Sequence, residues 1–174
     1  MKRLLVVVDV QNDFVDGTLG TKEAVAIIPN VVNKINNWDG DIVFTRDTHF
    51  SNYMETNEGK HLPVMHCICG TEGHAINQDV LDALPDGKQF MSFDKNQFGC
   101  IDLANMIWQF CYDYIEIIGL CTDICVISNA LIIKARCPEA TIAVDSSCCA
   151  GVTPESHDAA IATMKMCQID VIGE

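Results

Sequence analysis

The chain lacks any apolar run that approaches a membrane-spanning helix, for which about 20 residues are needed. Basic residues are also scarce, because 11 Lys and Arg stand against 24 Asp and Glu among the 174 residues, which gives a formal net charge of −13. A surface of this sign repels phosphate backbones and anionic lipid headgroups. We therefore expect no nucleic-acid partner and no membrane partner.

Motifs that hold phosphates or activate a serine are missing as well. The sequence contains neither GxGxxG nor GxxxxGK[ST], and nothing in it resembles a serine nucleophile elbow. The first residues carry one basic pair and an apolar run of five at 4–8, which is shorter than the core of a signal peptide. We expect a buried first strand there and a cytoplasmic protein.

Cysteine, by contrast, is abundant, with ten residues. A chain of this length has enough core to be stable without disulfides, and Cys125 lies inside an apolar periodic segment. The pairs Cys67/Cys69 and Cys148/Cys149 are spaced too closely for a zinc ribbon. The pattern favours reduced thiols in the cytoplasm.

Short β-branched runs alternate with longer segments of helical periodicity. In the segment 23–38 the helical pattern contains Pro29, so we expect the regular helix to begin only there. The polar segment 51–77 has little periodicity and is expected to be a long excursion. Strands that are apolar on both faces and alternate with helices are typical of a parallel sheet with helices on both sides. We expect an α/β fold of three layers, α/β/α, in one domain over residues 1–174. Its central, mostly parallel sheet should have about six strands, at 4–8, 41–45, 89–93, 114–118, 141–144 and 169–172.

Ionisable side chains follow four of these strands. Asp9 follows the first, Asp47 the second and Lys95 the third, and Cys125 stands near the start of the helix after the fourth. Parallel strands end at one edge of a sheet, where ligands bind, so these side chains should converge. A helix terminus and a cation can lower a thiol pKa. Cys125 is therefore a candidate nucleophile, although a cysteine that only fills the core is the more common case.

Five segments resemble the isochorismatase-like cysteine hydrolases, and within them the nicotinamidase/pyrazinamidase branch. They are VVVDVQNDFVDG (6–17), TRDTH (45–49), HCICGTEG (66–73), DKNQFG (94–99) and GLCTDICVISNALIIKA (119–135). The resemblance implies the fold of that family and a catalytic triad of Asp9, Lys95 and Cys125. It also implies an oxyanion hole made by backbone N–H groups of Cys121 and Cys125, with a cis peptide bond between Leu120 and Cys121.

The chemistry of the three residue types supports this triad independently. A thiolate needs a positive neighbour, which Lys95 and the helix terminus supply. Amide hydrolysis also needs a group that accepts the thiol proton and returns it to departing ammonia, and Asp9 is suited to this. We therefore hypothesise acyl transfer through a thioester at Cys125, followed by hydrolysis.

The resemblance further implies a divalent metal site. Asp47-x-His49 is a plausible ligand pair, and His66 corresponds to a later histidine ligand of the family. Glu58 is the preferred fourth ligand, with Glu55 as the alternative. Imidazole and carboxylate ligands suit Zn²⁺ best, with Mn²⁺ or Fe²⁺ also compatible. The alternative is that these histidines are surface or capping residues in a loop.

The substrate implied by the resemblance is nicotinamide, converted to nicotinate and ammonia. Phe14 fits one aromatic wall of the pocket, whereas Leu62 stands where the family has a tryptophan, and one extra residue separates the following proline from His66. This departure keeps open another small amide, ureido or carbamoyl substrate for the same triad. Isochorismate hydrolysis is less favoured, and a non-catalytic metal- or thiol-binding protein is the alternative of another class. A homo-oligomer, a dimer or a tetramer, is the expected assembly.

Overall fold

The computed structural model describes residues 1–85 and 90–174, and its centre is a sheet of six parallel strands. The strand order is β3-β2-β1-β4-β5-β6, which confirms the expected α/β fold. The predicted strand at 89–93 is shifted towards the carboxyl end, and residue 89 lies outside the described residues. The strands are β1 (Arg3–Val8), β2 (Asp41–Asp47), β3 (Met91–Lys95), β4 (Tyr114–Leu120), β5 (Thr141–Ala150) and β6 (Asp170–Ile172).

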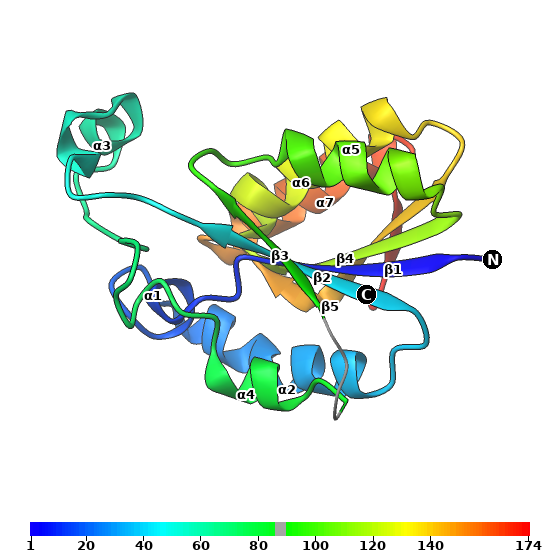
Figure 1. Ribbon diagram of the computed structural model, residues 1–174, viewed down its shortest axis with the longest axis horizontal. Coiled ribbons are helices and arrows are strands. Elements are labelled where there is room, and N and C mark those ends of the chain that lie inside the picture. The colour runs from blue at the N-terminus through cyan, green and yellow to red at the C-terminus, as the bar shows by residue number, and fades with distance from the viewer. Residues whose placement is uncertain (86–89) are drawn as a thin grey trace.

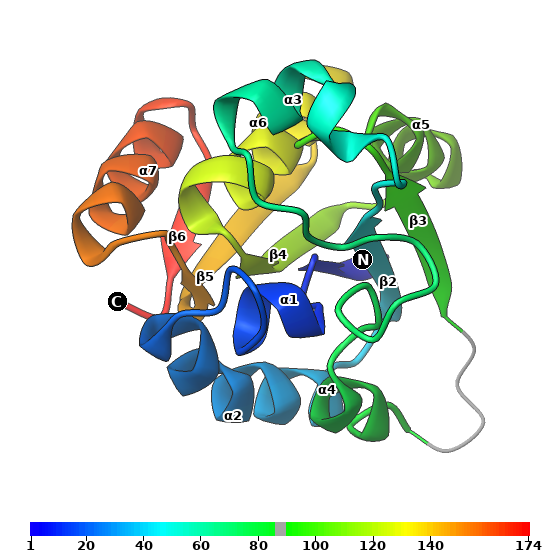
Figure 2. The same ribbon diagram turned by 90° about the vertical axis from the view of Figure 1, so that its left-hand side faces the viewer.

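Helices cover both faces of this sheet (Figure 1). Figure 2, which looks toward the carboxyl ends of the strands, shows α1, α2 and α4 on one side and α5, α6 and α7 on the other. The short helix α3 lies beyond the carboxyl edge of the sheet. The helices are α1 (Asn12–Val15), α2 (Lys22–Asn36), α3 (Asn57–His61), α4 (Gln78–Asp82), α5 (Ile101–Phe110), α6 (Ile127–Arg136) and α7 (Pro154–Met166), with short turns η1 (Tyr53–Glu55) and η2 (Thr122–Val126).

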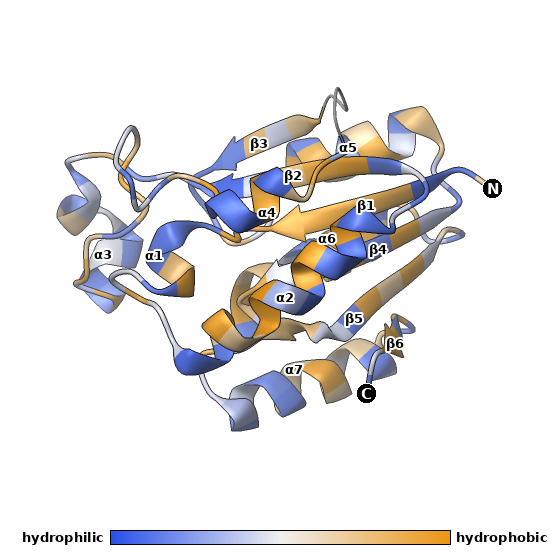
Figure 3. Ribbon diagram, turned by 90° about the horizontal axis from the view of Figure 1, so that it is seen from below, coloured by the Kyte–Doolittle hydropathy of each residue, from blue (hydrophilic) through white to orange (hydrophobic). Residues whose placement is uncertain are grey.

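The core is divided by the sheet into two clusters, because successive side chains of a strand point to opposite faces. In β1, Leu4, Val6 and Val8 pack with residues of α5, α6 and α7. The alternate residues Leu5 and Val7 pack with residues of α2 and α4. Figure 3 shows hydrophobic colour concentrated along the central strands, as expected for strands buried on both faces.

Helix α2 differs from its prediction, because it begins at Lys22 and runs through Pro29 without a break in its assignment. The Thr21 side chain caps its first turn by accepting a hydrogen bond from the Ala24 N–H at 3.0 Å. A buried face that includes Ile27 and Val31 packs on the sheet. This capping and packing compensate for the backbone hydrogen bond that proline cannot make.

Gly119 allows β4 to lie close to β1 where both strands end. Its φ is +120°, and a Cβ there would collide with the backbone of Val8, the last residue of β1. Only glycine adopts such a conformation without strain. The chain then enters η2, a π-helical turn, before α6 begins at Ile127, so the helix predicted after the fourth strand starts as a wider turn.

Within the described residues, no helix combines the length and the apolar character needed to cross a membrane.

Candidate active site

The carboxyl edge of the sheet brings together Asp9, Lys95 and Cys125. The Lys95 ammonium lies 2.6 Å from Oδ2 of Asp9 and 3.6 Å from Sγ of Cys125. All three side chains are buried, and Cys125 lines a pocket. Asp9 directly follows β1, Lys95 ends β3, and Cys125 lies in η2. The side chains that sequence reasoning selected are therefore in mutual reach.

The electrostatics of this group differ from the prediction of an acidic thiol. Burial raises the pKa of Cys125 well above its ordinary value, and the Asp9 carboxylate adds to this rise, while Lys95 opposes it. The prediction counted the lysine and the helix terminus and left out burial, which is the largest effect. Burial thus favours the neutral form of the thiol.

Asp9 and Lys95 form an ion pair inside the protein. Burial raises the pKa of Asp9, and the charge of Lys95 partly opposes that rise. Burial lowers the pKa of Lys95, but the negative charges around it, above all Asp9, outweigh this, so the pKa of Lys95 lies above its ordinary value. The lysine stays charged, and the carboxylate has an increased tendency to accept a proton.

Thr45 fixes the orientation of the Asp9 carboxylate. Its hydroxyl, on β2, donates to Oδ1 of Asp9 at 2.6 Å, and both side chains are fully buried. The backbone N–H of Asp9 in turn donates to the Thr45 carbonyl at 3.2 Å. With Oδ1 held in this way, Oδ2 faces Lys95.

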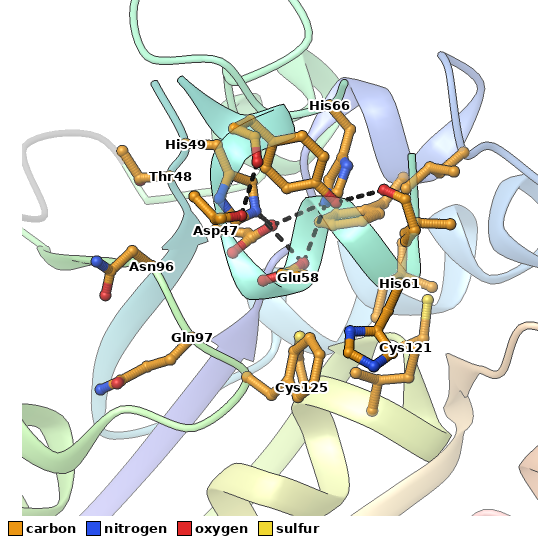
Figure 4. A pocket seen from close by; sticks show the side chains of 18 of the residues that line it. Asp47, Thr48, His49, Glu58, His61, His66, Asn96, Gln97, Cys121 and Cys125 are labelled. Atoms are coloured by element: carbon orange, nitrogen blue, oxygen red, sulfur yellow. Dashed lines mark hydrogen bonds and ion pairs between the residues drawn. The ribbon is translucent and has the colours of Figure 1, made fainter. Parts of the chain in front are cut away.

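Four further predicted residues form a second group beside the triad: Asp47, His49, Glu58 and His66. Oδ2 of Asp47 lies 2.9 Å from Nε2 of His49 and 3.3 Å from Nε2 of His66. Oε1 of Glu58 lies 3.6 Å and 3.8 Å from the same two nitrogens. Figure 4 shows these side chains converging on one side of the pocket, with Cys125 across from them.

This group fits a divalent metal ion. Its ligand atoms lie within 4.8 Å of one another, and Nε2 of His49 and Nε2 of His66 both face the Asp47 carboxylate. Burial lowers the pKa of His49, but Asp47 and Glu58 raise it to about 9, so the group favours added positive charge. Two imidazoles and two carboxylates are ligands of Zn²⁺, Mn²⁺ and Fe²⁺. Glu58 belongs to this group, whereas Glu55, the alternative, is solvent-exposed.

Tyr53 and the backbone hold the two imidazoles in place. Nδ1 of His66 lies 2.7 Å from the Val64 carbonyl, which leaves Nε2 directed at the carboxylates. The Tyr53 ring is fully buried against both imidazoles, with centroid distances of 4.6 Å to His49 and 5.1 Å to His66. Its hydroxyl donates to the Leu62 carbonyl at 2.9 Å and so connects the segment after α3 to the site.

Gln11 fixes the backbone of Asp47. Its side-chain oxygen accepts from the Asp47 N–H at 2.7 Å, and its side-chain nitrogen donates to the Asp47 carbonyl at 2.9 Å. The same nitrogen donates to the carbonyl of His74, also at 2.9 Å. Gln11 is fully buried, so these bonds have no competition from water.

The pocket lined by Cys125 and by the four residues of the second group has a volume of about 940 Å³. Phe14 packs on the His66 ring with a centroid distance of 5.5 Å, and Leu62 is 39% exposed at the rim. Both line the pocket, as predicted. Among the described residues that line it there is no lysine and no arginine, whereas Asp47 and Glu58 supply negative charge.

The peptide bond between Leu120 and Cys121 is cis, as the family resemblance implied. Both residues line the pocket next to Cys125. Cys121 is partly exposed, and burial raises the pKa of its thiol to about 12.

Sequence reasoning missed Gln11, Thr45 and Tyr53. Gln11 and Thr45 stand inside the segments VVVDVQNDFVDG and TRDTH. The sequence signal that could have pointed to them is a polar residue in or next to a predicted buried strand. Tyr53 lies in the polar excursion, where no periodicity singles it out. Their roles come from contacts between segments that are distant in the chain.

Comparison with known proteins agrees with this geometry. A family model described as the isochorismatase domain matches residues 3–173, so the chain belongs to the isochorismatase family. It is an isochorismatase-family hydrolase. A search of the curated proteins gave no match.

Solved structures of nicotinamidases and pyrazinamidases are similar to the chain. A pyrazinamidase of Pyrococcus horikoshii in complex with zinc is 27% identical, with a TM-score of 0.83 over 100% of both chains. A pyrazinamidase/nicotinamidase of Streptococcus mutans is 26% identical, with a TM-score of 0.85 over 98% of this chain and 100% of the other. A nicotinamidase/pyrazinamidase of Bacillus subtilis, 24% identical, shares the fold, with a TM-score of 0.84 over 99% of this chain and 100% of that one.

Proposed function

We propose that the protein is a cysteine amidohydrolase that cleaves the C–N bond of a small neutral amide through a thioester at Cys125. The observation that carries this proposal is the position of the Lys95 ammonium, 2.6 Å from Asp9 and 3.6 Å from the Cys125 sulfur, beside an open pocket. An acid, a base and a nucleophile in mutual reach are the minimum equipment for acyl transfer.

In the acylation step the Cys125 sulfur attacks the amide carbonyl carbon. The raised pKa of Cys125 favours a thiol, whose proton moves to the Asp9 carboxylate as the C–S bond forms, and the raised pKa of Asp9 favours this transfer. The carbonyl electrons move to oxygen, where backbone N–H groups of Cys121 and Cys125 are proposed to stabilise the oxyanion. Asp9 then gives the proton to the amide nitrogen, the C–N bond breaks, and ammonia leaves.

In the second step water hydrolyses the thioester. Asp9 is again a carboxylate and accepts a proton from the attacking water. As the C–S bond breaks, Asp9 passes this proton to the departing sulfur, which restores the thiol and the carboxylate. Lys95 keeps its charge throughout, because the surrounding carboxylates hold its pKa above the ordinary range. Its role is to balance the negative charge that passes between sulfur, oxygen and Asp9.

Asp47, His49, Glu58 and His66 are proposed to hold a divalent metal ion, with zinc as the first candidate. The support is the donor set and the relationship to a pyrazinamidase solved with zinc. Such an ion supplies a Lewis acid to which a ring nitrogen of the substrate can bind. Metal analysis of protein purified without chelators tests this assignment, and a protein that binds neither zinc nor manganese tightly would contradict it.

The charge of the pocket favours a neutral substrate. Its described lining offers no lysine or arginine to pair with a substrate carboxylate, and the charges of Asp47 and Glu58 would be balanced by the proposed metal ion. Isochorismate, a dicarboxylate, is therefore disfavoured, and nicotinamide, which is neutral, is the first candidate. A second candidate is another neutral amide, ureido or carbamoyl compound with a larger apolar part, because Leu62 replaces a tryptophan and the pocket volume is about 940 Å³.

Ammonia release from nicotinamide, pyrazinamide and a panel of carbamoyl compounds tests the proposal. We expect turnover of at least one neutral amide by the wild type and none above background by Cys125→Ala. Rapid acid quenching should leave the mass of one acyl group on the protein, on the peptide that contains Cys125. Full turnover by Cys125→Ala would disprove the thioester.

We further propose that the chain forms one domain that works as a homo-oligomer in the reducing cytoplasm. All ten cysteines are free, which suits a reducing compartment. Light scattering during gel filtration measures the assembly, and a monomer at micromolar concentration would contradict it.

A further inference from the structure

Helix α6 carries one amide side chain on its buried face, Asn129, which is fully removed from solvent. Its side-chain oxygen accepts from the Cys100 N–H at 2.9 Å. Its side-chain nitrogen donates to the Phe98 carbonyl at 3.2 Å and to the Cys125 carbonyl at 2.8 Å. The amide therefore uses its oxygen and both of its N–H donors on backbone groups.

These partners belong to two different segments of the active site. Cys125 lies in η2, the turn that carries the sulfur. Phe98 and Cys100 lie in the loop that leaves β3 directly after Lys95. The Asn129 amide thus connects the turn that carries Cys125 to the loop that follows Lys95.

The bridged loop is closely seated on α6. A Cβ at Gly99 would collide with the side chain of Ile132, so the backbone of the loop lies directly against the helix. Phe98, one residue earlier, lines the pocket and is half-exposed. Movement of this loop would therefore change both the Lys95 position and one wall of the pocket.

We propose that Asn129 is a positioning residue, which sets the separation between Lys95 and Cys125 and the placement of Phe98. This inference rests on the proposed function, because it assigns Asn129 to the geometry of the amide-cleaving site. Without the bridge, the Cys100 N–H loses this acceptor, the Phe98 and Cys125 carbonyls lose this donor, and the hydrogen-bonded link between the turn and the loop is gone. A displacement of about 1 Å from productive geometry can lower a rate about 100-fold.

Asn129→Ala and Asn129→Ser together distinguish a bridge between the two segments from a hydrogen bond to the Cys125 carbonyl alone. Asn129→Ala removes both ends of the bridge. Asn129→Ser keeps a donor for the carbonyl four residues earlier, that of Cys125, but its shorter side chain does not reach the loop. Asn129→Asp keeps the acceptor for the Cys100 N–H and is the second test if the alanine variant does not fold.

Tyr112→Phe is the matched control. The Tyr112 hydroxyl donates to Asp41 at 2.8 Å, near the opposite edge of the sheet, and the side chain is buried. Its loss removes a buried hydrogen bond without touching the site. Every variant is assayed at a temperature well below its own unfolding midpoint, so that only folded protein is compared.

We expect kcat for ammonia release to fall at least about tenfold in the alanine and serine variants, while Tyr112→Phe keeps the wild-type value within about twofold. A smaller loss in either Asn129 variant would overturn the inference. A purely structural role predicts a lower unfolding midpoint in the Asn129 variants with an unchanged kcat.

A second measurement needs no substrate. Iodoacetamide labelling is followed by peptide mass spectrometry, as the ratio of Cys125 to the exposed Cys69. Because burial is the main cause of the raised thiol pKa, loss of the bridge should raise this ratio at least about threefold. If the wild type cleaves no amide, the proposed function fails, and this ratio alone decides the inference: a rise supports the bridge, and an unchanged ratio overturns it.

Discussion

The Lys95 ammonium lies 2.6 Å from the Asp9 carboxylate, and both side chains are buried. Removal of one partner of a buried ion pair leaves the other charge without compensation, which costs about 3–5 kcal/mol. We expect Asp9→Asn and Lys95→Met each to lower the free energy of unfolding by about this amount. The double variant should lose less than the sum of the two. Urea unfolding measures all three, and strict additivity would mean that the pair is not coupled.

The hydrogen bond from Thr45 to Asp9 predicts a change in pH dependence. Asp9 must be deprotonated to accept the thiol proton, so kcat/KM falls as the pH drops through the pKa of the coupled site. The Thr45 hydroxyl stabilises the carboxylate and lowers the pKa of Asp9. Thr45→Val should therefore move the acidic limb of the pH profile to higher pH, whereas Thr45→Ser should leave it in place. An unmoved limb in Thr45→Val would show that this bond does not tune the base.

The contacts of Gln11 with the Asp47 backbone predict a metal-binding phenotype. Loss of groups that orient a metal ligand commonly lowers metal affinity about 10- to 100-fold. We expect Gln11→Leu to weaken zinc binding within this range, measured by competition with a chromophoric chelator. Gln78→Leu, which alters an exposed glutamine on α4, is the control and should bind zinc like the wild type. Equal affinity in the Gln11 variant would contradict an orienting role.

A buried ion pair away from the pocket predicts how stability depends on pH. Lys34 lies 2.7 Å from Asp145 and 2.6 Å from Glu116. Burial raises the pKa of Asp145, but the bonds from Lys34 and Ser147 outweigh it, so the pKa lies below its ordinary value. The unfolded state therefore binds the proton more readily, and the stabilisation is present above about pH 4 and lost as the pH falls through the folded pKa.

Asp145→Asn should accordingly lower the free energy of unfolding at pH 7 by about 1–3 kcal/mol, and by less at pH 3. Urea titrations at several pH values measure this difference between wild type and variant. A difference that is the same at pH 3 and pH 7 would contradict the assignment. Glu116 still pairs with Lys34 in the variant, so the lysine keeps one partner.

The sequence sufficed to predict which side chains lie together at the candidate site, because their places follow from simple rules. Asp9, Asp47 and Lys95 each stand at the carboxyl end of a predicted strand, and parallel strands bring such ends to one edge. Glu58 could be preferred over Glu55 before the structure was known, and α3 turns it toward the two imidazoles. Periodicity likewise predicted the six strands, of which β1, β2, β4 and β5 are largely buried in a sheet covered by helices.

What the sequence did not predict depends on contacts or burial that exist only in the folded chain. From the sequence, Asn129 is only a residue of low helix propensity. Its three side-chain hydrogen bonds to backbone groups arise because the loop after Lys95 lies against α6. The thiol of Cys125 was expected to be acidic, since a lysine is visible in a motif whereas complete burial is not. Pro29 suggested a helix start, because the cap at Thr21 and the packed face of α2 carry no sequence signal of comparable strength.

The place of β3 in the sheet has one more consequence. Asp9 follows an inner strand, but Lys95 ends the outermost strand on its side, which pairs with β2 and is largely solvent-exposed. Strands at the edge of a sheet can unfold locally at a lower free-energy cost than global unfolding of the protein. We expect catalysis to stop at urea concentrations that leave the circular dichroism spectrum native, with the amide protons of Met91–Lys95 among the first to exchange. The lifetime of the active enzyme is then limited by the local stability of β3. Substitutions that stabilise this edge strand would extend that lifetime without any change to the core.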